Sequence, residues 1–154
     1  MSVNIDDIPT DQFIDTNVLV YAHDISAGVK HARAKHLLQE LWKSKQGCLS
    51  IQVLQEFYVN ITRKVAAPLS ASETAQIIPA LAVWKIHTPQ ANDILEAIRV
   101  QQRYHLSFWD AMIVWSAARL GCAVLWSEDL DPGQTYEGVQ VRNPFAVSDE
   151  PSTL

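Results

Sequence analysis

Two kinds of hydrophobic pattern alternate along the chain. Short stretches rich in apolar and β-branched residues are typical of buried strands, and they are bounded here by polar or turn-forming residues. Four such strands are expected, and "WKIHTP" (84–89) offers room for a fifth short one. The four are "QFID" (12–15), "GCLSI" (47–51), "CAVLWS" (122–127) and "GVQVRNPF" (138–145).

Between these stretches, apolar residues recur at the three- and four-residue spacing of a helix with one buried face. Thr16 is expected to cap the first helix, Ser70 and Glu73 form a capping-box pattern, and Pro79 should bend or divide its helix. Helices are predicted over 17–24, 30–45, 51–65, 68–84, from Thr88 and Pro89 to Tyr104, and over 107–121. Strands that alternate with helices predict a mostly parallel sheet between two helical layers, a three-layer α/β/α domain.

One polar interruption breaks this pattern near the start of the chain. In "DQFIDTNVLVYA", Asp15, Thr16 and Asn17 separate two apolar runs that both belong in a core. A carboxylate buried between such runs needs a partner. Because ligands gather beyond the carboxyl ends of parallel strands, the end of this first strand is a candidate functional site.

Further acidic residues map to the ends of other predicted elements. Asp110 lies in the first turn of a helix, Glu56 near the start of another, and Asp129 just after "CAVLW". Carboxylates gathered in one place repel and raise each other's pKa, so a cation would be needed to neutralise them. Oxygen ligands without His or Cys favour Mg²⁺ or Mn²⁺, and such a site suits hydrolysis of phosphodiester bonds.

Each of these acidic residues also has a structural explanation. In "SFWD", Asp110 can complete a capping box with Ser107, and Asp129 can be an ordinary turn residue. Helical periodicity alone places Glu56 at a boundary or in solvent. Asp131, two residues beyond Asp129, is an alternative to it. Asp24 could contribute if its helix turns inward, but a solvated position is expected.

Composition and charge bound these interpretations. The chain has 154 residues, 48% of them hydrophobic and 19% charged, which fits one domain over 1–146 with a flexible tail over 147–154. No stretch approaches the roughly 20 apolar residues of a membrane span, and the first residues lack a secretory pattern, so a cytoplasmic protein is expected. Its two cysteines, Cys48 and Cys122, are expected to be reduced and buried. A net charge of −5 argues against nucleic-acid binding by bulk positive charge alone.

Four segments in this order resemble the PIN-domain nucleases over about residues 11–145. They are "FIDTNVLVYA", the glutamate in "VLQEFYVNITRK", "SFWDAMIVWSAARLGC" and "LWSEDL". The chain is most similar to the VapC-like toxins of prokaryotic toxin–antitoxin pairs. The resemblance implies a metal-dependent endoribonuclease that is a homodimer, cuts RNA in single-stranded or loop regions, and is inhibited by a cognate antitoxin.

The resemblance also assigns roles to individual residues. Asp15, Glu56, Asp110 and Asp129 would be the catalytic and metal-binding set for Mg²⁺ or Mn²⁺, with Thr16, Asn17 and Ser127 as supporting residues. Apart from the resemblance, Arg63 and Lys64 are candidates for contacting the RNA backbone because their helix carries Glu56, with a solvated helix face as the alternative. Trp109 and Trp126 are candidates for base stacking by position, and both, Trp126 above all, could equally be core residues.

Two other classes of protein remain as alternatives. A PIN-fold module that binds RNA or a protein partner without cutting would share these motifs. An aspartate phosphatase or a phosphoacceptor receiver is disfavoured: Asn17 stands where the common aspartate phosphatases have a second Asp, and no late lysine is in place for a receiver.

Overall fold

A six-stranded sheet forms the centre of the protein, in the order β3-β2-β1-β4-β6-β5. The computed structural model describes residues 10–146. Neighbouring strands are parallel except at one edge, where β5 runs antiparallel to β6. The strands are β1 (Gln12–Ile14), β2 (Gly47–Ser50), β3 (Lys85–His87), β4 (Val124–Trp126), β5 (Thr135–Tyr136) and β6 (Val139–Arg142).

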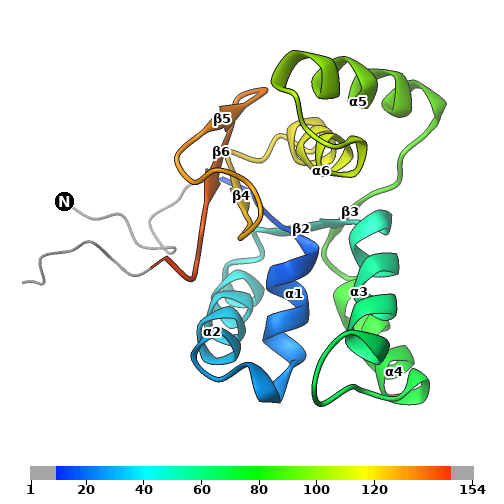
Figure 1. The fold of residues 1–154 in the computed structure, drawn as a ribbon, viewed down its shortest axis with the longest axis vertical. Helices are drawn as coiled ribbons and strands as arrows, with labels where there is room; N and C mark the ends of the chain where they lie inside the picture. The colour runs from blue at the N-terminus through cyan, green and yellow to red at the C-terminus, as the bar shows by residue number, and fades with distance from the viewer. Residues whose placement is uncertain (1–9, 147–154) are drawn as a thin grey trace, which may run out of the picture.

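Helices cover both faces of this sheet (Figure 1). On one face lie α1, α2 and α3, with α4 packed against α3, and on the other lie α5 and α6. The helices are α1 (Thr16–His23), α2 (Val29–Ser44), α3 (Ile51–Arg63), α4 (Ala71–Leu81), α5 (Ala91–Tyr104) and α6 (Phe108–Arg119), with a 3₁₀ turn η2 (Ile25–Ala27). The prediction of a three-layer α/β/α domain is confirmed, while the predicted tail, 147–154, lies outside the described residues.

The first strand is the central one and positions the polar interruption that follows it. Phe13 and Ile14 are fully buried, and β1 pairs in parallel with both β2 and β4. The backbone N–H of Asp15 continues this pairing by donating to the Trp126 carbonyl at 3.0 Å. The carboxyl ends of β1 and β4 therefore lie side by side, and residues about 110 positions apart in sequence become neighbours.

Helix α3 begins directly where β2 ends. Ser50 caps it, because its hydroxyl accepts a hydrogen bond from the Val53 N–H at 3.3 Å. Val53, Phe57 and Ile61 on one face of the helix are fully buried. This packing holds the helix against the sheet and places Glu56, in its second turn, beside the end of β1.

Several element boundaries differ from those expected from sequence. The cap of α1 is Asp15 rather than Thr16, because the Asp15 carboxylate accepts from the Thr16 N–H. Helix α5 begins at Ala91, not at Thr88–Pro89, and the Asp93 carboxylate accepts a hydrogen bond from the Gln90 N–H at 2.9 Å. The capping box of Ser70 and Glu73 is confirmed in α4, but Pro79 lies two residues before the end of that helix and does not divide it.

Strand β5 was not anticipated from sequence. It joins β6 through Glu137 and Gly138, which both have positive φ, 50° and 82°. This is the geometry of a tight hairpin turn, which usually has Asn or Asp before Gly. Glu137 is held there by tertiary contacts: it accepts hydrogen bonds from Arg99 at 2.6 Å and Tyr104 at 2.8 Å.

Two simpler expectations concern the cysteines and the membrane. Cys48 and Cys122 are both free and buried, as predicted. Within residues 10–146, none of the helices is long and apolar enough to cross a membrane.

Candidate active site

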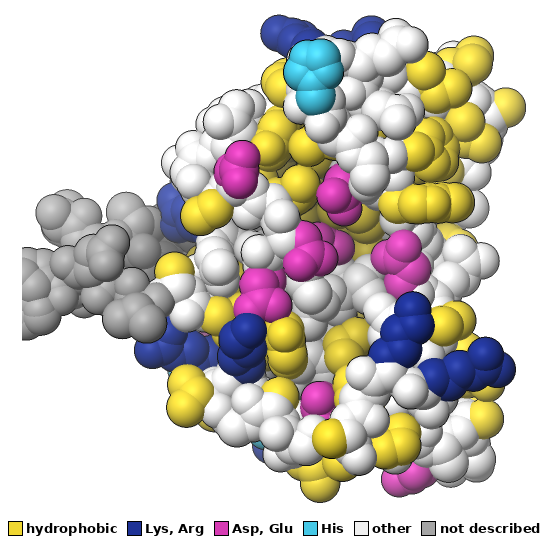
Figure 2. Space-filling model, viewed as in Figure 1, with side chains coloured by type: hydrophobic (Ala, Val, Ile, Leu, Met, Phe, Trp, Pro, Cys, Tyr) yellow, Lys and Arg dark blue, Asp and Glu magenta, His cyan; other side chains and the backbone are white. Residues whose placement is uncertain are grey.

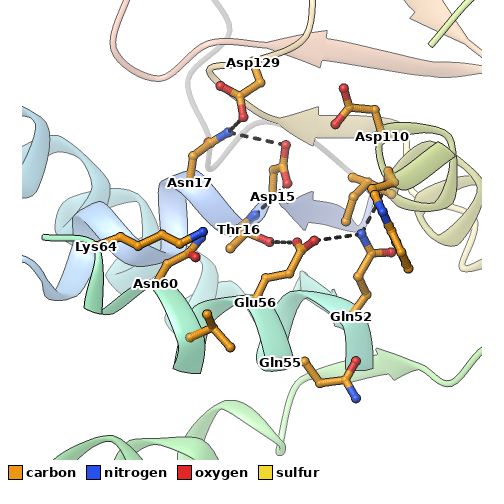
Figure 3. Close-up of a pocket in the computed structure, with 13 residues that line it drawn as sticks. Asp15, Thr16, Asn17, Gln52, Gln55, Glu56, Asn60, Lys64, Asp110 and Asp129 are labelled. Atoms are coloured by element: carbon orange, nitrogen blue, oxygen red, sulfur yellow. Dashed lines mark hydrogen bonds between the residues drawn. The ribbon is translucent and has the colours of Figure 1, made fainter. Parts of the chain in front are cut away.

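The four acidic residues singled out from sequence line one pocket of about 440 Å³. It opens at the carboxyl ends of the parallel strands, and Figure 2 shows acidic side chains gathered over the hollowed middle of this face, with basic side chains on its flanks. Asp15 follows β1, Glu56 comes from α3, Asp110 from the first turn of α6 and Asp129 from the loop after β4 (Figure 3). The fold thus brings together side chains from four separate parts of the chain.

Asp15 is the most deeply buried of the four, with only 5% of its surface exposed. One carboxylate oxygen accepts from the Thr16 N–H at 2.7 Å, and the other accepts from the Ser127 hydroxyl at 2.7 Å. Burial raises its pKa from the ordinary 3.8 to about 7; these two hydrogen bonds oppose that shift, and the charges of Asp110 and Asp129 add to it. The site therefore makes ionisation of Asp15 unfavourable unless positive charge is supplied.

Asn17 and Ser127 connect Asp15 to Asp129. The Asn17 side-chain N–H₂ donates to the Asp129 carboxylate at 2.9 Å, and its carbonyl oxygen accepts from the Glu128 N–H at 3.2 Å. The Ser127 hydroxyl, besides donating to Asp15, accepts from the Asp129 N–H at 3.1 Å. These bonds fix the loop after β4 against the start of α1, so that two carboxylates on different segments keep one relative position.

Glu56 is held by a separate pair of donors. The Thr16 hydroxyl donates to one of its carboxylate oxygens at 2.6 Å, and the Gln52 side-chain N–H₂ donates to the other at 3.3 Å. Gln52 was not recognised from sequence. Its position four residues before Glu56 on the same helix is the signal that would have indicated a contact.

Asp110 is fixed by the start of its helix. The Ser107 hydroxyl accepts from the Asp110 N–H at 3.1 Å, which forms half of the expected capping box. Among the described residues, the Ser107 N–H makes no return bond to the Asp110 carboxylate, which lines the pocket instead. Partial burial raises the pKa of Asp110, and the neighbouring carboxylates of Asp129 and Glu56 raise it further.

The ligand chemistry of this pocket fits a hard divalent cation. Its acidic residues offer carboxylate oxygens alone, which suit Mg²⁺ or Mn²⁺. Burial, with a further contribution from repulsion among the carboxylates, already raises the pKa of Asp15 and Asp110. Within residues 10–146, no three His, Cys, Asp or Glu side chains stand close enough to hold one ion jointly. Because Mg²⁺ commonly keeps several waters and binds through one or two carboxylates, the donor set remains compatible with it.

Of the four candidates for RNA contact, the structure places two in the pocket lining and two outside it. Lys64 lines the pocket, whereas Arg63 does not. Trp109 also lines the pocket and is 62% exposed, so its ring is available for stacking. Trp126 is partly buried against the core, and its indole N–H donates to Gln12 at 2.8 Å.

Two further acidic residues are placed away from this pocket. Asp131 is exposed and lies outside the pocket lining, so the structure places Asp129 rather than Asp131 beside the other carboxylates. The expectation that Asp24 is solvated is wrong. Only 6% of its surface is exposed, because its carboxylate caps the 3₁₀ turn η2 by accepting from the Ser26 N–H at 3.0 Å.

Comparison with known proteins adds an independent observation. A family model described as PIN domain matches residues 13–137. No curated protein matches the chain.

Several solved structures share the fold. VapC20 of Mycobacterium tuberculosis, described as a sarcin-ricin loop cleaving toxin, is 22% identical with a TM-score of 0.59, over 75% of this chain and 87% of that one. A toxin–antitoxin complex from Klebsiella pneumoniae is 19% identical with a TM-score of 0.64, over 89% of this chain and 100% of that one. DNA-bound VapBC from Salmonella typhimurium is 15% identical with a TM-score of 0.60, over 88% of this chain and 98% of that one.

Proposed function

The chain belongs to the PIN domain family, and we propose that it is a divalent-metal-dependent endoribonuclease, the toxin of a toxin–antitoxin pair. The observation that carries this proposal is the convergence of Asp15, Glu56, Asp110 and Asp129 on one pocket. A structural role does not account for that arrangement, since burying Asp15 raises its pKa to about 7 and so weakens the folded state at neutral pH.

The proposed site for Mg²⁺ or Mn²⁺ consists of the four carboxylates of Asp15, Glu56, Asp110 and Asp129. One or two of them would contact the ion directly, and the others would act through the water that such an ion keeps. When bound, the metal would lower the pKa of a coordinated water and stabilise the charge that grows on the phosphate and the leaving oxygen. The chain's own contribution is to fix the ligands. Thr16 orients Glu56, while Ser127 and Asn17 hold Asp15 and Asp129 in one relative position.

An RNA strand in single-stranded or loop form is the proposed substrate. Among the described residues that line the pocket, Lys64 alone is basic, and it would contact a phosphate next to the cleaved one. The exposed ring of Trp109 offers a stacking surface for an unpaired base. An unpaired strand presents both a free base and a flexible backbone, whereas a duplex hides its bases.

Replacing Lys64 with Gln is expected to raise the KM for RNA about tenfold, because one charge-assisted contact to a phosphate contributes about 1.5 kcal/mol. The rate constant at saturating RNA should change little, since the carboxylates remain. Arg63→Gln is the matched control: Arg63 is adjacent, exposed and outside the pocket lining, so its KM should stay near that of the wild type. An equal rise in KM for both variants would mean that Lys64 has no specific contact.

A homodimer and a cognate antitoxin are the proposed protein partners. Support comes from the fold shared with toxin–antitoxin complexes from Klebsiella pneumoniae and Salmonella typhimurium. The protein also has apolar surface to cover: on α5, Ile94 is 46%, Leu95 64% and Ile98 38% exposed. Co-purification with the product of a neighbouring gene and the mass of the particle in solution would test these two partners.

The proposed activity is tested by incubating an end-labelled single-stranded RNA with the purified protein in Mn²⁺ or in EDTA. We expect cleavage in Mn²⁺, none in EDTA, and recovery when excess Mn²⁺ is added back. Asp15→Asn purified in parallel controls for contaminating ribonuclease, which would survive the substitution. Cleavage that persists in EDTA, or that is equal in both proteins, would contradict the proposal.

If the wild-type protein cleaves no RNA under any metal condition, the alternative is favoured: a PIN-fold module that binds RNA or a protein without cutting. The two functions separate experimentally, because a non-cutting module would still bind labelled RNA. Its binding would also be insensitive to EDTA, since no metal would be needed to hold the phosphate.

A further inference from the structure

Gln52 has a buried polar atom without a partner at the edge of the pocket. Within residues 10–146, three buried side-chain nitrogen or oxygen atoms lack a hydrogen-bond partner: Gln12 Nε2, Trp84 Nε1 and Gln52 Oε1. Of these three residues, only Gln52 lines the carboxylate pocket, and 8% of its surface is exposed. An unpaired buried acceptor costs about 1–3 kcal/mol of stability, so its presence here needs a reason.

The reason lies in what the other end of the same amide does. The Gln52 N–H₂ group donates to the Glu56 carboxylate at 3.3 Å and to the Trp109 backbone carbonyl at 3.2 Å (Figure 3). Both partners are acceptors only, so turning the amide over would set its oxygen against two other oxygens. The observed orientation is therefore required, and it leaves Oε1 without a donor.

These two hydrogen bonds join the two sides of the pocket. Glu56 lies one helical turn after Gln52 on α3, and the Trp109 carbonyl belongs to the peptide that leads into Asp110 on α6. The two helices lie on opposite faces of the sheet (Figure 1). The Gln52 side chain reaches from one to the other beside the pocket. Gln52 thus ties the carboxylate of one helix to the backbone that carries the carboxylate of the other.

Stability alone does not account for a glutamine at this position. A methionine has similar length, would fill the same space, and would remove the unpaired acceptor. The Trp109 carbonyl lies in the first turn of α6, where helix geometry lets it accept from the N–H four residues later. The Glu56 carboxylate would keep its bond from the Thr16 hydroxyl at 2.6 Å. Losing the glutamine should therefore cost little folding free energy.

We propose that Gln52 is a positioning residue that sets the Glu56 carboxylate relative to Asp110, so that both can act on one bound metal ion. The inference rests on the proposed function and deepens it. Gln52 acts on the site through Glu56, whose carboxylate it ties to the first turn of α6. Loss of partners that orient metal ligands typically costs 10–100-fold in metal affinity or activity.

Gln52→Met tests this role, with Gln102→Met as the matched control. Gln102 lies on α5, is exposed and is outside the pocket lining. Three quantities are measured: Mn²⁺ affinity by calorimetry, the cleavage rate of labelled RNA at saturating Mn²⁺, and the melting temperature in EDTA. We expect Gln52→Met to lower Mn²⁺ affinity or the saturated rate at least about tenfold without lowering the melting temperature, and Gln102→Met to resemble the wild type.

A second measurement shows whether Gln52 acts through Glu56. In a Glu56→Ala background, adding Gln52→Met should lower Mn²⁺ affinity no further, because the group that Gln52 positions is already gone. An equal loss in both backgrounds, a wild-type-like Gln52→Met, or a large fall in its melting temperature would each overturn the inference. The proposed function would still stand in those cases, whereas a wild type that neither binds Mn²⁺ nor cleaves RNA would overturn both.

Discussion

Asp15→Asn is expected to reduce RNA cleavage in Mn²⁺ at least about a thousandfold, because a metal's stabilisation of developing charge amounts to several kcal/mol and each 1.36 kcal/mol is a factor of ten. Asp15 is the most buried carboxylate of the pocket, and its ionised form is disfavoured by that burial and by the charges of Asp110 and Asp129. A bound cation would offset both effects. The amide has nearly the same shape but no charge to attract the ion. The initial rate with labelled RNA at saturating Mn²⁺ is the measurement.

The same substitution should leave the protein folded. Asn can still accept from the Thr16 N–H, and it removes a carboxylate that the folded protein ionises with difficulty. Asp131→Asn is the matched control, since Asp131 is exposed outside the pocket and should not affect the rate. Full activity in Asp15→Asn, or a large loss in Asp131→Asn, would show that the wrong carboxylates have been identified.

The second large effect is a fall in the contribution of Asp15 to the stability of the metal-free protein as the pH rises from about 4 to 7. In the unfolded chain Asp15 would lose its proton near the ordinary pKa of 3.8, whereas in the folded protein its pKa is about 7. Over this window the unfolded state releases the proton first, so rising pH favours unfolding. The contribution of Asp15 to folding stability should decline by about 4 kcal/mol across this range.

Urea unfolding in EDTA at several pH values measures this change, and the difference between wild type and Asp15→Asn isolates it from other titrating groups. The variant should gain stability over the wild type as the pH rises, with most of the gain reached near pH 7. Adding Mn²⁺ at neutral pH should reverse the order, because the ion binds the ionised wild type in preference. A pH-independent difference between the two proteins would contradict the raised pKa.

The pattern of strands and helices was sufficient to predict the layers of the fold and the position of the carboxylates. Asp15 follows the central strand and Asp129 follows its neighbour β4, so the rule that parallel strands end at one edge placed both correctly. Asp110 also lines the pocket, as expected for a carboxylate fixed in the first turn of a helix. The alternation of strands and helices follows from local periodicity, which the sequence shows directly, whereas the strand order that sets β4 beside β1 comes from the structure.

Other features depend on contacts that a single sequence does not display. Strand β5 exists because Arg99 and Tyr104 hold Glu137 at a positive φ that its own preference disfavours. Asp24 is buried because its carboxylate closes a 3₁₀ turn, and nothing in the helical period of its neighbours indicates that turn. In the sequence Gln52 is an ordinary helical residue. Its contact with the Trp109 carbonyl forms only because α6 packs near α3.

The pairing of β1 with β4 also determines when the proposed nuclease can first become active during its own synthesis. A growing chain that has passed Asp110 already carries three of the four carboxylates, but Asp15 still lacks the Trp126 carbonyl and the Ser127 hydroxyl that fix it. The pocket is complete only after β4 has been made and inserted beside β1. Partial chains that end before β4 should therefore not cleave RNA, so the proposed activity would begin only once this strand has been added beside β1.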